Sequence, residues 1–199
     1  MTDMVVSPIT LNGTHVCLQP LTQAHSEGLL NIGQHDADWL YLPRPCLSDI
    51  ADTFRWISEA LQARHEGHQQ PFALVNPKTG EVMGSTRYMN IRPKDHVLEI
   101  GWTWLGAAFQ RSAVNTEAKY LLLKHAFETL GALRVELKTD LRNTRSQAAI
   151  ARIGGKQEGI FRKHTQVRDG YQRDTVWFSI IDEEWPTIKR TLEDKLASH

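Results

Sequence analysis

The sequence predicts a mixed α/β fold of the α+β class with about seven strands. Strand-like segments and segments of helical period follow one another in the order β, α, α, β, β, β, α, β, α, β, β. The longest helical segment, residues 115–130, is apolar almost all round, which is typical of a helix buried against a sheet. Because 199 residues are enough for one hydrophobic core, we expect a single domain over 1–199.

Local signals justify each element. Turn residues such as Asn12-Gly13 separate strands, Thr22 and Asn143 are side chains suited to helix caps, and Pro186 suits a first helical turn. The expected elements are a hairpin at 5–20, a helix at 22–33, an irregular loop at 36–49, a helix from Ser48 or Asp49 to Gly67, strands at 71–76, 81–91 and 97–104, the helix at 115–130, a strand at 133–139, a helix within 141–155, strands at 155–167 and 173–181, and a C-terminal helix from Trp185.

Composition excludes several classes of protein. The 23 basic and 23 acidic side chains balance, so no overall field attracts nucleic acid or anionic lipid. No apolar run approaches the roughly 20 residues of a membrane span, and the first ten residues do not form a secretory signal. Cys17 and Cys46 have neither metal-ligand spacing nor a disulfide framework. We expect a cytoplasmic monomer or homodimer with no metal and no nucleic-acid or membrane partner.

The stretch from Val97 to Gly155 carries the functional signal. A small-residue-rich loop, 105–114, connects the strand at 97–104 to the long helix. The N-terminus of a helix offers unpaired N–H groups and a partial positive charge, which suit a phosphate or pyrophosphate. The alternative is an ordinary α/β crossover without a ligand.

Four segments, taken in this order, resemble the GCN5-related N-acetyltransferase (GNAT) superfamily and, within it, the RimJ/RimL-type ribosomal-protein alanine acetyltransferases. They are LEIGWTWL (98–105), QRSAVNTEA (110–118), NTRSQAAIARIGG (143–155) and EGIFRKH…DGYQRDTVWFSI (158–180). The resemblance implies one GNAT domain with a mostly antiparallel mixed sheet, a splay between its fourth and fifth strands, and helices on both faces. It also implies acetyl-CoA as the acetyl donor.

The resemblance assigns residues to acetyl-CoA. The backbone of the strand at 98–104, including Trp102, Thr103 and Trp104, pairs with the pantetheine arm in that family. The loop that follows wraps the pyrophosphate, with Ala113 and Asn115 at two positions where the family favours a small residue. Alanine is tolerated there if φ is negative, and Asn115 is a good helix cap. The loop residues are Gln110, Arg111, Ser112, Ala113, Val114 and Asn115.

The helix after the strand at 133–139 supplies two further candidates. Asn143 matches an asparagine that contacts the cofactor arm, and Ser146 matches a serine found in the RimL branch. A helix cap is the simpler role for Asn143, and both roles are compatible because capping uses only the side-chain oxygen. Ile150 stands where many members carry a tyrosine acid, so Ser146 becomes the candidate hydrogen-bond donor to the leaving thiolate.

Glu99 is the candidate general base, because several GNAT enzymes place a glutamate on this strand; otherwise it is an edge carboxylate or a partner of Arg87 or Arg134. His164 is the second candidate, with an ordinary pKa of about 6.5. The glutamate that RimL-type enzymes carry near this point is replaced by Thr165, so that base does not carry over.

The acceptor pocket and the phosphate end are read from side-chain type. Two pairs of aromatic residues, Trp39 with Tyr41 and Trp102 with Trp104, can either form the walls of a pocket or pack in the core. At least one of Trp102 and Trp104 is expected in the core. A cluster of basic residues can bind the 3′-phosphate of CoA; the alternative is that these residues form a solvent-exposed helix face. The pocket candidates are Trp39, Tyr41, Arg87 and His164; the basic cluster is Arg142, Arg145, Arg152 and Lys156.

The expected reaction is direct attack of a primary amine on the thioester. An α-amino group with a pKa near 7.7–8.0 is about one-tenth neutral at pH 7, whereas a lysine near 10.4 is neutral in well under a thousandth. A site without a convincing base therefore favours an α-amine, on a protein N-terminus, an amino acid or an aminoacyl-type small molecule. A non-catalytic acyl-CoA sensor is the alternative function.

Overall fold

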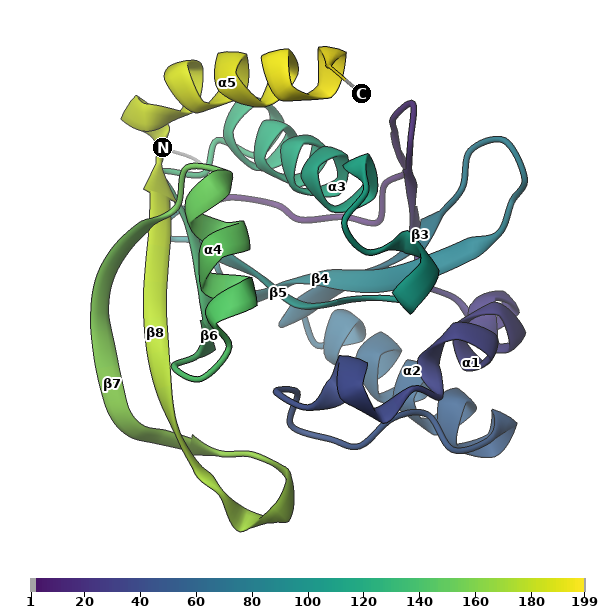
Figure 1. Ribbon diagram of the computed structural model, residues 1–199. Helices are drawn as coiled ribbons and strands as arrows, with labels where there is room; N and C mark the ends of the chain where they lie inside the picture. The colour runs from purple at the N-terminus through teal and green to yellow at the C-terminus, as the bar shows by residue number, and fades with distance from the viewer. Residues whose placement is uncertain (1–2, 199) are drawn as a thin grey trace.

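An eight-stranded sheet forms the centre of the protein in a computed structural model that describes residues 3–198 (Figure 1). The strand order is β1-β2-β3-β4-β5-β6-β8-β7, and every neighbouring pair is antiparallel except β5 and β6. The predicted mixed, mostly antiparallel sheet is therefore confirmed. The count is eight instead of about seven because the hairpin at 5–20 contributes two separate short strands.

The predicted elements are all present, with shifted ends. The strands are β1 (Leu11–Asn12), β2 (Cys17–Pro20), β3 (Gln69–Val75), β4 (Val82–Arg92), β5 (Val97–Leu105), β6 (Arg134–Asp140), β7 (Lys156–Gln166) and β8 (Gln172–Ile181). The α-helices are α1 (Ser26–Gly33), α2 (Ile50–His65), α3 (Ala113–Lys124), α4 (Thr144–Arg152) and α5 (Trp185–Ala197). None of the helices in residues 3–198 is both long and apolar enough to cross a membrane.

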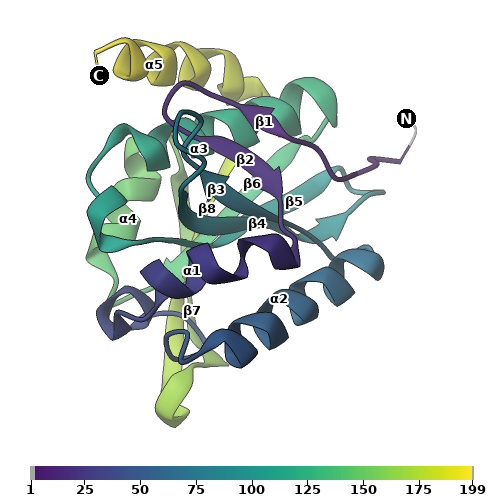
Figure 2. The same cartoon turned by 90° about the vertical axis from the view of Figure 1, so that its right-hand side faces the viewer.

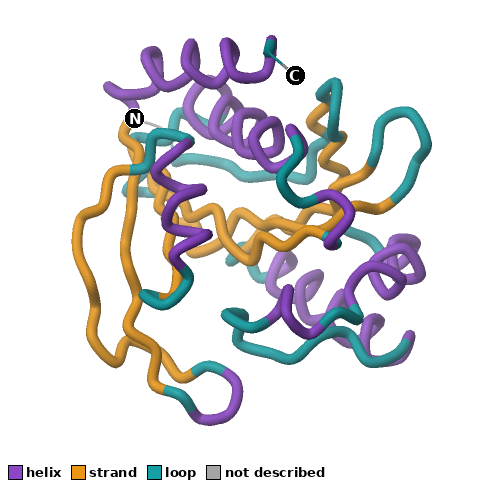
Figure 3. Tube along the Cα trace, in the orientation of Figure 1, coloured by secondary structure: helices purple, strands orange, loops and turns teal. Residues whose placement is uncertain are grey.

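Helices cover both faces of the sheet (Figures 1 and 2). Helices α1 and α2 pack on one face, where three fully or nearly fully buried tryptophans, Trp39, Trp56 and Trp104, contact one another. Helices α3, α4 and α5 pack on the other face over the larger core. The tube in Figure 3 shows how the two helical layers enclose the orange strands. Asp49 caps α2 by accepting a hydrogen bond from the N–H of Asp52.

Helix α3 begins two residues earlier than predicted. Ser112 is its N-cap and accepts a hydrogen bond from the N–H of Val114, so Asn115 lies inside the first turn and is not the cap. The helix ends in a π-helical turn at His125–Thr129. Glu117 of this helix is only 6% exposed, because the turn between β1 and β2 covers it.

The sheet divides between β5 and β6. The two strands pair only from Val97 with Arg134 to Glu99 with Glu136, and no pairing follows. Next to this point β5 bulges: Ser85 and Arg87 of β4 face Trp104 and Gly101, so β5 has one extra residue. Trp102 adopts a φ of 50° within the bulge, a conformation that non-glycine residues rarely take outside functional sites. The predicted splay is therefore present, between β5 and β6 of the eight strands.

Candidate active site

A cavity of about 760 Å³ occupies the gap between β5 and β6. Both faces of the sheet contribute to its wall. Ile100 and Leu137 belong to the core beneath α3, whereas Glu99 and Lys138 form an ion pair and so project together from the opposite face. The cavity therefore connects the face covered by α3 and α4 with the face on which α1 and α2 lie. We call the part next to α3 and α4 the donor side, and the part next to α1 and α2 the acceptor side.

The loop before α3 forms one wall of the donor side. Gln110, Arg111, Ser112 and Asn115 line the cavity, and Arg111 adopts a left-handed φ of 57° that turns the chain into the helix. Ala113, which has a helical φ as alanine requires, is buried and does not line the cavity, and neither does Val114. The side chains at 113 and 114 face the core, so these two positions offer a ligand only their backbone.

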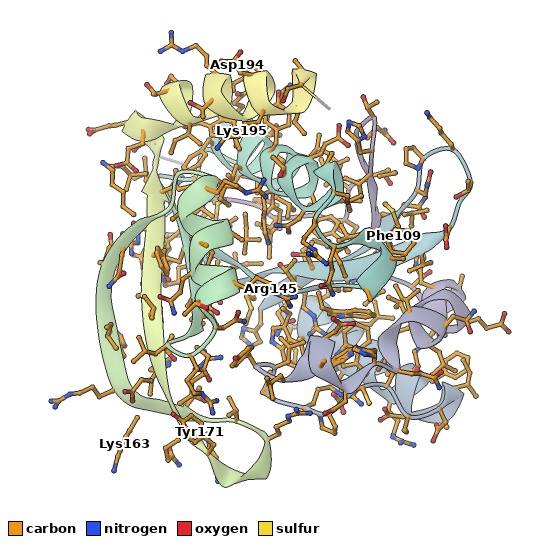
Figure 4. The ribbon with its side chains drawn as sticks, viewed as in Figure 1. Phe109, Arg145, Lys163, Tyr171, Asp194 and Lys195 are labelled. Atoms are coloured by element: carbon orange, nitrogen blue, oxygen red, sulfur yellow. The ribbon has the colours of Figure 1, made fainter. Side chains whose placement is uncertain are left out.

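The Gln110 side chain is held by hydrogen bonds to residues around the cavity. Its Nε2 donates to Asp38 Oδ1 at 2.6 Å and to the carbonyl of Leu105 at 3.0 Å, and its Oε1 accepts from Arg145 at 2.9 Å. Figure 4 shows Arg145 on α4, on the side that faces this loop. The Gln110 side chain thus connects three segments that surround the cavity.

Helix α4 forms the opposite wall of the donor side. Asn143 caps it, with Oδ1 accepting from the N–H of Ser146 at 3.0 Å, so the predicted cap is confirmed. Asn143 and Ser146 both line the cavity, and the amide nitrogen of Asn143 is not used by the cap. Ala148, Ala149 and the largely buried Ile150 complete an apolar wall. This wall, with the α3 N-terminus and nearby arginines, suits a long ligand that is apolar along its arm and anionic at one end.

Only part of the basic cluster faces the cavity. Arg145 and Arg152 line it. Arg142 pairs with Asp140 and stacks on the ring of Tyr171 at 3.6 Å, and Lys156 pairs with Glu184. Arg142 and Lys156 do not line the cavity, and each pairs with a carboxylate.

The two tryptophans at the bulge of β5, Trp102 and Trp104, lie in different surroundings. Trp104 is 4% exposed in the tryptophan cluster, which confirms the expectation that one of the pair is core. Trp102 is half-buried and lines the cavity. Thr103 lies beside them and accepts a hydrogen bond from Lys119 Nζ at 2.6 Å. Lys119 is 6% exposed and lines the cavity, and burial lowers its pKa to about 7.

Glu99 lies where the two strands part. It is 2% exposed, and its Oε2 accepts from Asn90 at 2.6 Å and from Lys138 Nζ at 2.8 Å. Neither Arg87 nor Arg134, the alternative partners considered from the sequence, pairs with it in the described structure. The carboxylate is thus held in place by two donors at the entrance to the acceptor side.

The acceptor side is enclosed by two loops that dock on each other. The ring of Tyr41 lies in the wall, and its hydroxyl donates to the carbonyl of Arg142 at 3.4 Å. Across from it, Arg168 between β7 and β8 pairs with Asp36. His164 also lines the cavity, 3.1 Å from Thr175 Oγ1, and burial, Lys138 and Arg173 lower its pKa. The lowered pKa favours the neutral imidazole of His164.

Two of the pocket candidates are corrected by the structure. Trp39 is fully buried, 4.7 Å from the ring of Trp104, and does not reach the cavity. Arg87 is 5% exposed, lies between the rings of Trp56 and Trp102, and donates to Gln69. Both belong to the packing between α2 and the sheet, because β4 turns this face toward the tryptophan cluster.

Sequence reasoning missed three cationic residues that line the cavity: Lys119, Lys138 and Arg173. Lys119 stands among apolar residues of the α3 segment, and a lysine on an otherwise apolar helix face is a signal of a buried functional group. Lys138 and Arg173 project from the same face of the sheet as Glu99, which alternation along β6 and β8 indicates once their register is known.

A mixed sheet that parts between two parallel strands, with a helix N-terminus beside the gap, can hold a long ligand with an anionic end. The chain belongs to the GNAT acetyltransferase family, whose acetyltransferase domain matches residues 15–156. Members of this family are N-acetyltransferases and take the acetyl group from acetyl-CoA. The resemblance stated from the sequence is confirmed.

Solved structures and a curated relative agree with this assignment. A GCN5-related N-acetyltransferase from Brucella melitensis has a TM-score of 0.92 and 30% identity, over 98% of this chain and 89% of that chain. Mycobacterium smegmatis RimJ, solved with CoA-disulfide, shares the fold with a TM-score of 0.83 and 22% identity, over 98% of this chain and 97% of that one. YdaF of Bacillus subtilis (strain 168), named for an inferred ribosomal N-acetyltransferase activity, is 31% identical over 106 residues, 53% of this chain. The match covers 57% of the length of YdaF.

Proposed function

We propose that the protein transfers an acetyl group from acetyl-CoA to a primary α-amine. The observation that carries the proposal is the cavity through the sheet, which joins a donor side at the α3 N-terminus to an acceptor side at Glu99 and His164. Such a cavity holds two reactants end to end at the bulge of β5. Proximity of this kind replaces a bimolecular encounter by an intramolecular step.

The α-amine is favoured by the chemistry of the acceptor side. Glu99 is already engaged by Lys138 and Asn90, and His164 is a neutral base of lowered pKa. Neither group is arranged to deprotonate a lysine ammonium, whose pKa is near 10.4. An α-amine is about one-tenth neutral at pH 7, so it needs a base only as its nitrogen becomes positive during attack.

The chain's groups divide the reaction between them. The amine nitrogen forms a bond to the thioester carbon, and the carbon–sulfur bond breaks. Backbone N–H groups of the bulge at Trp102 and Thr103 stabilise the developing oxyanion, and the strained backbone there sets their direction. Glu99 or His164 accepts the proton that leaves the amine, and the Ser146 hydroxyl hydrogen-bonds the departing thiolate, which takes its proton from solvent.

Release of free thiol tests this function directly. Purified protein with acetyl-CoA is given a panel of amines, and thiol is measured with a disulfide reagent. Release that depends on an α-amine supports the proposal. Binding of CoA without release from any amine would instead favour a non-catalytic acyl-CoA sensor.

Ser146→Ala is expected to lower kcat about tenfold, the value of one hydrogen bond to the thiolate. Asn143→Ala is expected to lower turnover and also to lose a helix cap worth roughly 1 kcal/mol. Asn143→Asp separates the two roles, because aspartate caps equally well but brings no amide N–H. We expect Asn143→Asp to keep the wild-type melting temperature and to weaken acetyl-CoA binding. Wild-type rates in all three variants would remove α4 from the mechanism.

Glu99→Gln is expected to lower kcat/KM about a hundredfold, because the carboxylate accepts the amine proton. Glu136→Gln is the matched control: Glu136 faces Glu99 in the strand register but does not line the cavity. An unchanged kcat/KM in Glu99→Gln would leave proton transfer to His164.

A further inference from the structure

The acceptor side of the cavity contains more positive than negative charge. Glu99, Lys138 and Arg173 line this side, and Lys138 forms an ion pair with Glu99; Arg142 and Asp140, which do not line the cavity, form a second pair. Burial, Lys138 and Arg173 lower the pKa of His164, which favours its neutral form. Arg173 is left over: among the side chains that the structure describes, no carboxylate forms an ion pair with it.

Arg173 is held as a binding group would be. Its Nε donates to Thr175 Oγ1 at 3.0 Å, which fixes the side chain along the face of β8, and the residue lines the cavity. Among the side chains that the structure describes, none accepts a hydrogen bond from the two terminal nitrogens of the guanidinium. Burial lowers the pKa of Arg173, with Asp140 and Glu99 opposing this effect from a distance. The two terminal nitrogens are accessible to solvent in the free protein and can donate to an anion that binds in the cavity.

We propose that Arg173 binds a carboxylate that the acceptor carries close to its primary amine. This inference rests on the proposed function and specifies its substrate class. The planar guanidinium offers two parallel N–H groups, which match a carboxylate in a bidentate manner. Glu99 stands on the same side of the cavity and attracts the amine, so the pair Glu99 and Arg173 is complementary to a molecule with an amine at one end and a carboxylate nearby.

Two sources of this carboxylate fit the site. One is the α-carboxylate of a free amino acid. The other is the side chain of an aspartate or glutamate at the N-terminus of a polypeptide, whose α-amine is then the acceptor. Both present an amine and a carboxylate separated by a few bonds, and Tyr41 and His164 bound the same space.

Two pairs of acceptors distinguish the sources. Alanine is compared with alaninamide, and a short peptide amide starting with aspartate is compared with the same peptide starting with asparagine. Initial rates of thiol release give kcat/KM for each. Because a carboxylate also changes the amine's own pKa, the informative quantity is the change in each ratio between wild type and Arg173→Gln.

In Arg173→Gln we expect the preference for the carboxylate member of one pair to fall about tenfold to a hundredfold. Arg173→Lys should retain part of it, because the charge remains while the bidentate geometry is lost. Arg162→Gln, an exposed arginine of β7 that does not line the cavity, should leave both ratios unchanged. The pair that responds identifies the source.

Equal ratios in wild type and both Arg173 variants, with turnover retained, would overturn this inference and leave the transferase function standing. No thiol release by the wild-type protein from any acceptor would overturn the proposed function and the inference with it. Melting curves of each variant separate loss of binding from loss of folding. The acceptor preference of the wild-type protein is a further test that needs no variant. Equal kcat/KM within both pairs, at matched concentrations of neutral amine, would also overturn the inference.

Discussion

Lys119→Met is expected to raise the melting temperature of the protein and to slow acetyl transfer. Lys119 is 6% exposed beneath the bulge of β5, and burial lowers its pKa to about 7. A charged ammonium in this position destabilises the folded state, and methionine fills a similar volume without a charge. We expect a gain of roughly 2–4 kcal/mol at pH 6, or about 5 °C or more in Tm.

The gain should depend on pH in a defined direction. In the unfolded chain Lys119 has a pKa near 10.4, whereas in the folded protein it is about 7. Below pH 7 both states are protonated and the folded state carries the whole desolvation penalty. Between pH 7 and about 10.4 the folded protein loses this proton while the unfolded chain keeps it. The advantage of methionine is therefore largest at pH 7 and below, and decreases as the pH rises to 10.

Activity should change in the opposite direction to stability. Lys119 Nζ donates to Thr103 Oγ1, and Thr103 in turn lies 2.7 Å from Thr86 Oγ1 across the bulge. Without this connection the bulge is free to relax, and we expect kcat/KM to fall about tenfold, the value of one charge-assisted hydrogen bond.

Melting curves from pH 6 to pH 10 and thiol-release kinetics measure both effects. Lys124→Met, on the exposed side of the same helix, is the control and should change neither. If Lys119→Met lowered Tm at pH 6, Lys119 would stabilise the folded protein, and the inference that its buried charge is destabilising would be wrong.

Glu117→Ala is expected to lower the free energy of unfolding by roughly 3–5 kcal/mol. The Glu117 carboxylate accepts three backbone N–H groups from the turn between β1 and β2, those of Thr14, His15 and Val16, at 2.6 to 2.9 Å. Alanine would leave these donors without a partner in a largely buried position. Gly13 shows how closely the turn surrounds the carboxylate, because a Cβ there would lie 2.5 Å from Glu117 Oε2.

Urea unfolding measures this loss. Glu117→Gln retains one acceptor and should lose less than half as much. Asp194→Ala, an exposed acidic residue of α5 visible at the top of Figure 4, should stay within about 0.5 kcal/mol of wild type. A loss below 1 kcal/mol in Glu117→Ala would show that water replaces the carboxylate and that the turn does not depend on it.

The elements and the family were predictable because local signals agree with one another. Asn143 looks like a helix cap and is one, and the apolar helix after the loop at 105–114 lies against the sheet as its pattern requires. The loop itself suggested a phosphate site before any resemblance was considered, with an ordinary crossover as the alternative. At the acceptor side, side-chain type did not predict position. Trp39 and Arg87 have side chains suited to a pocket but are buried under α2.

The sequence by itself determined which segments are strands and helices, where α4 is capped, and that a helix N-terminus follows a strand in a pattern of the GNAT family. These depend on contacts within a few residues. Only the tertiary structure decided that Lys119 and Glu117 are buried, that Arg173 forms no ion pair with any carboxylate that the structure describes, and that Glu99 pairs with Lys138. The reason is physical: burial and charge pairing are set by chain segments that lie far apart in sequence, and β5 and β6 part only where their pairing ends.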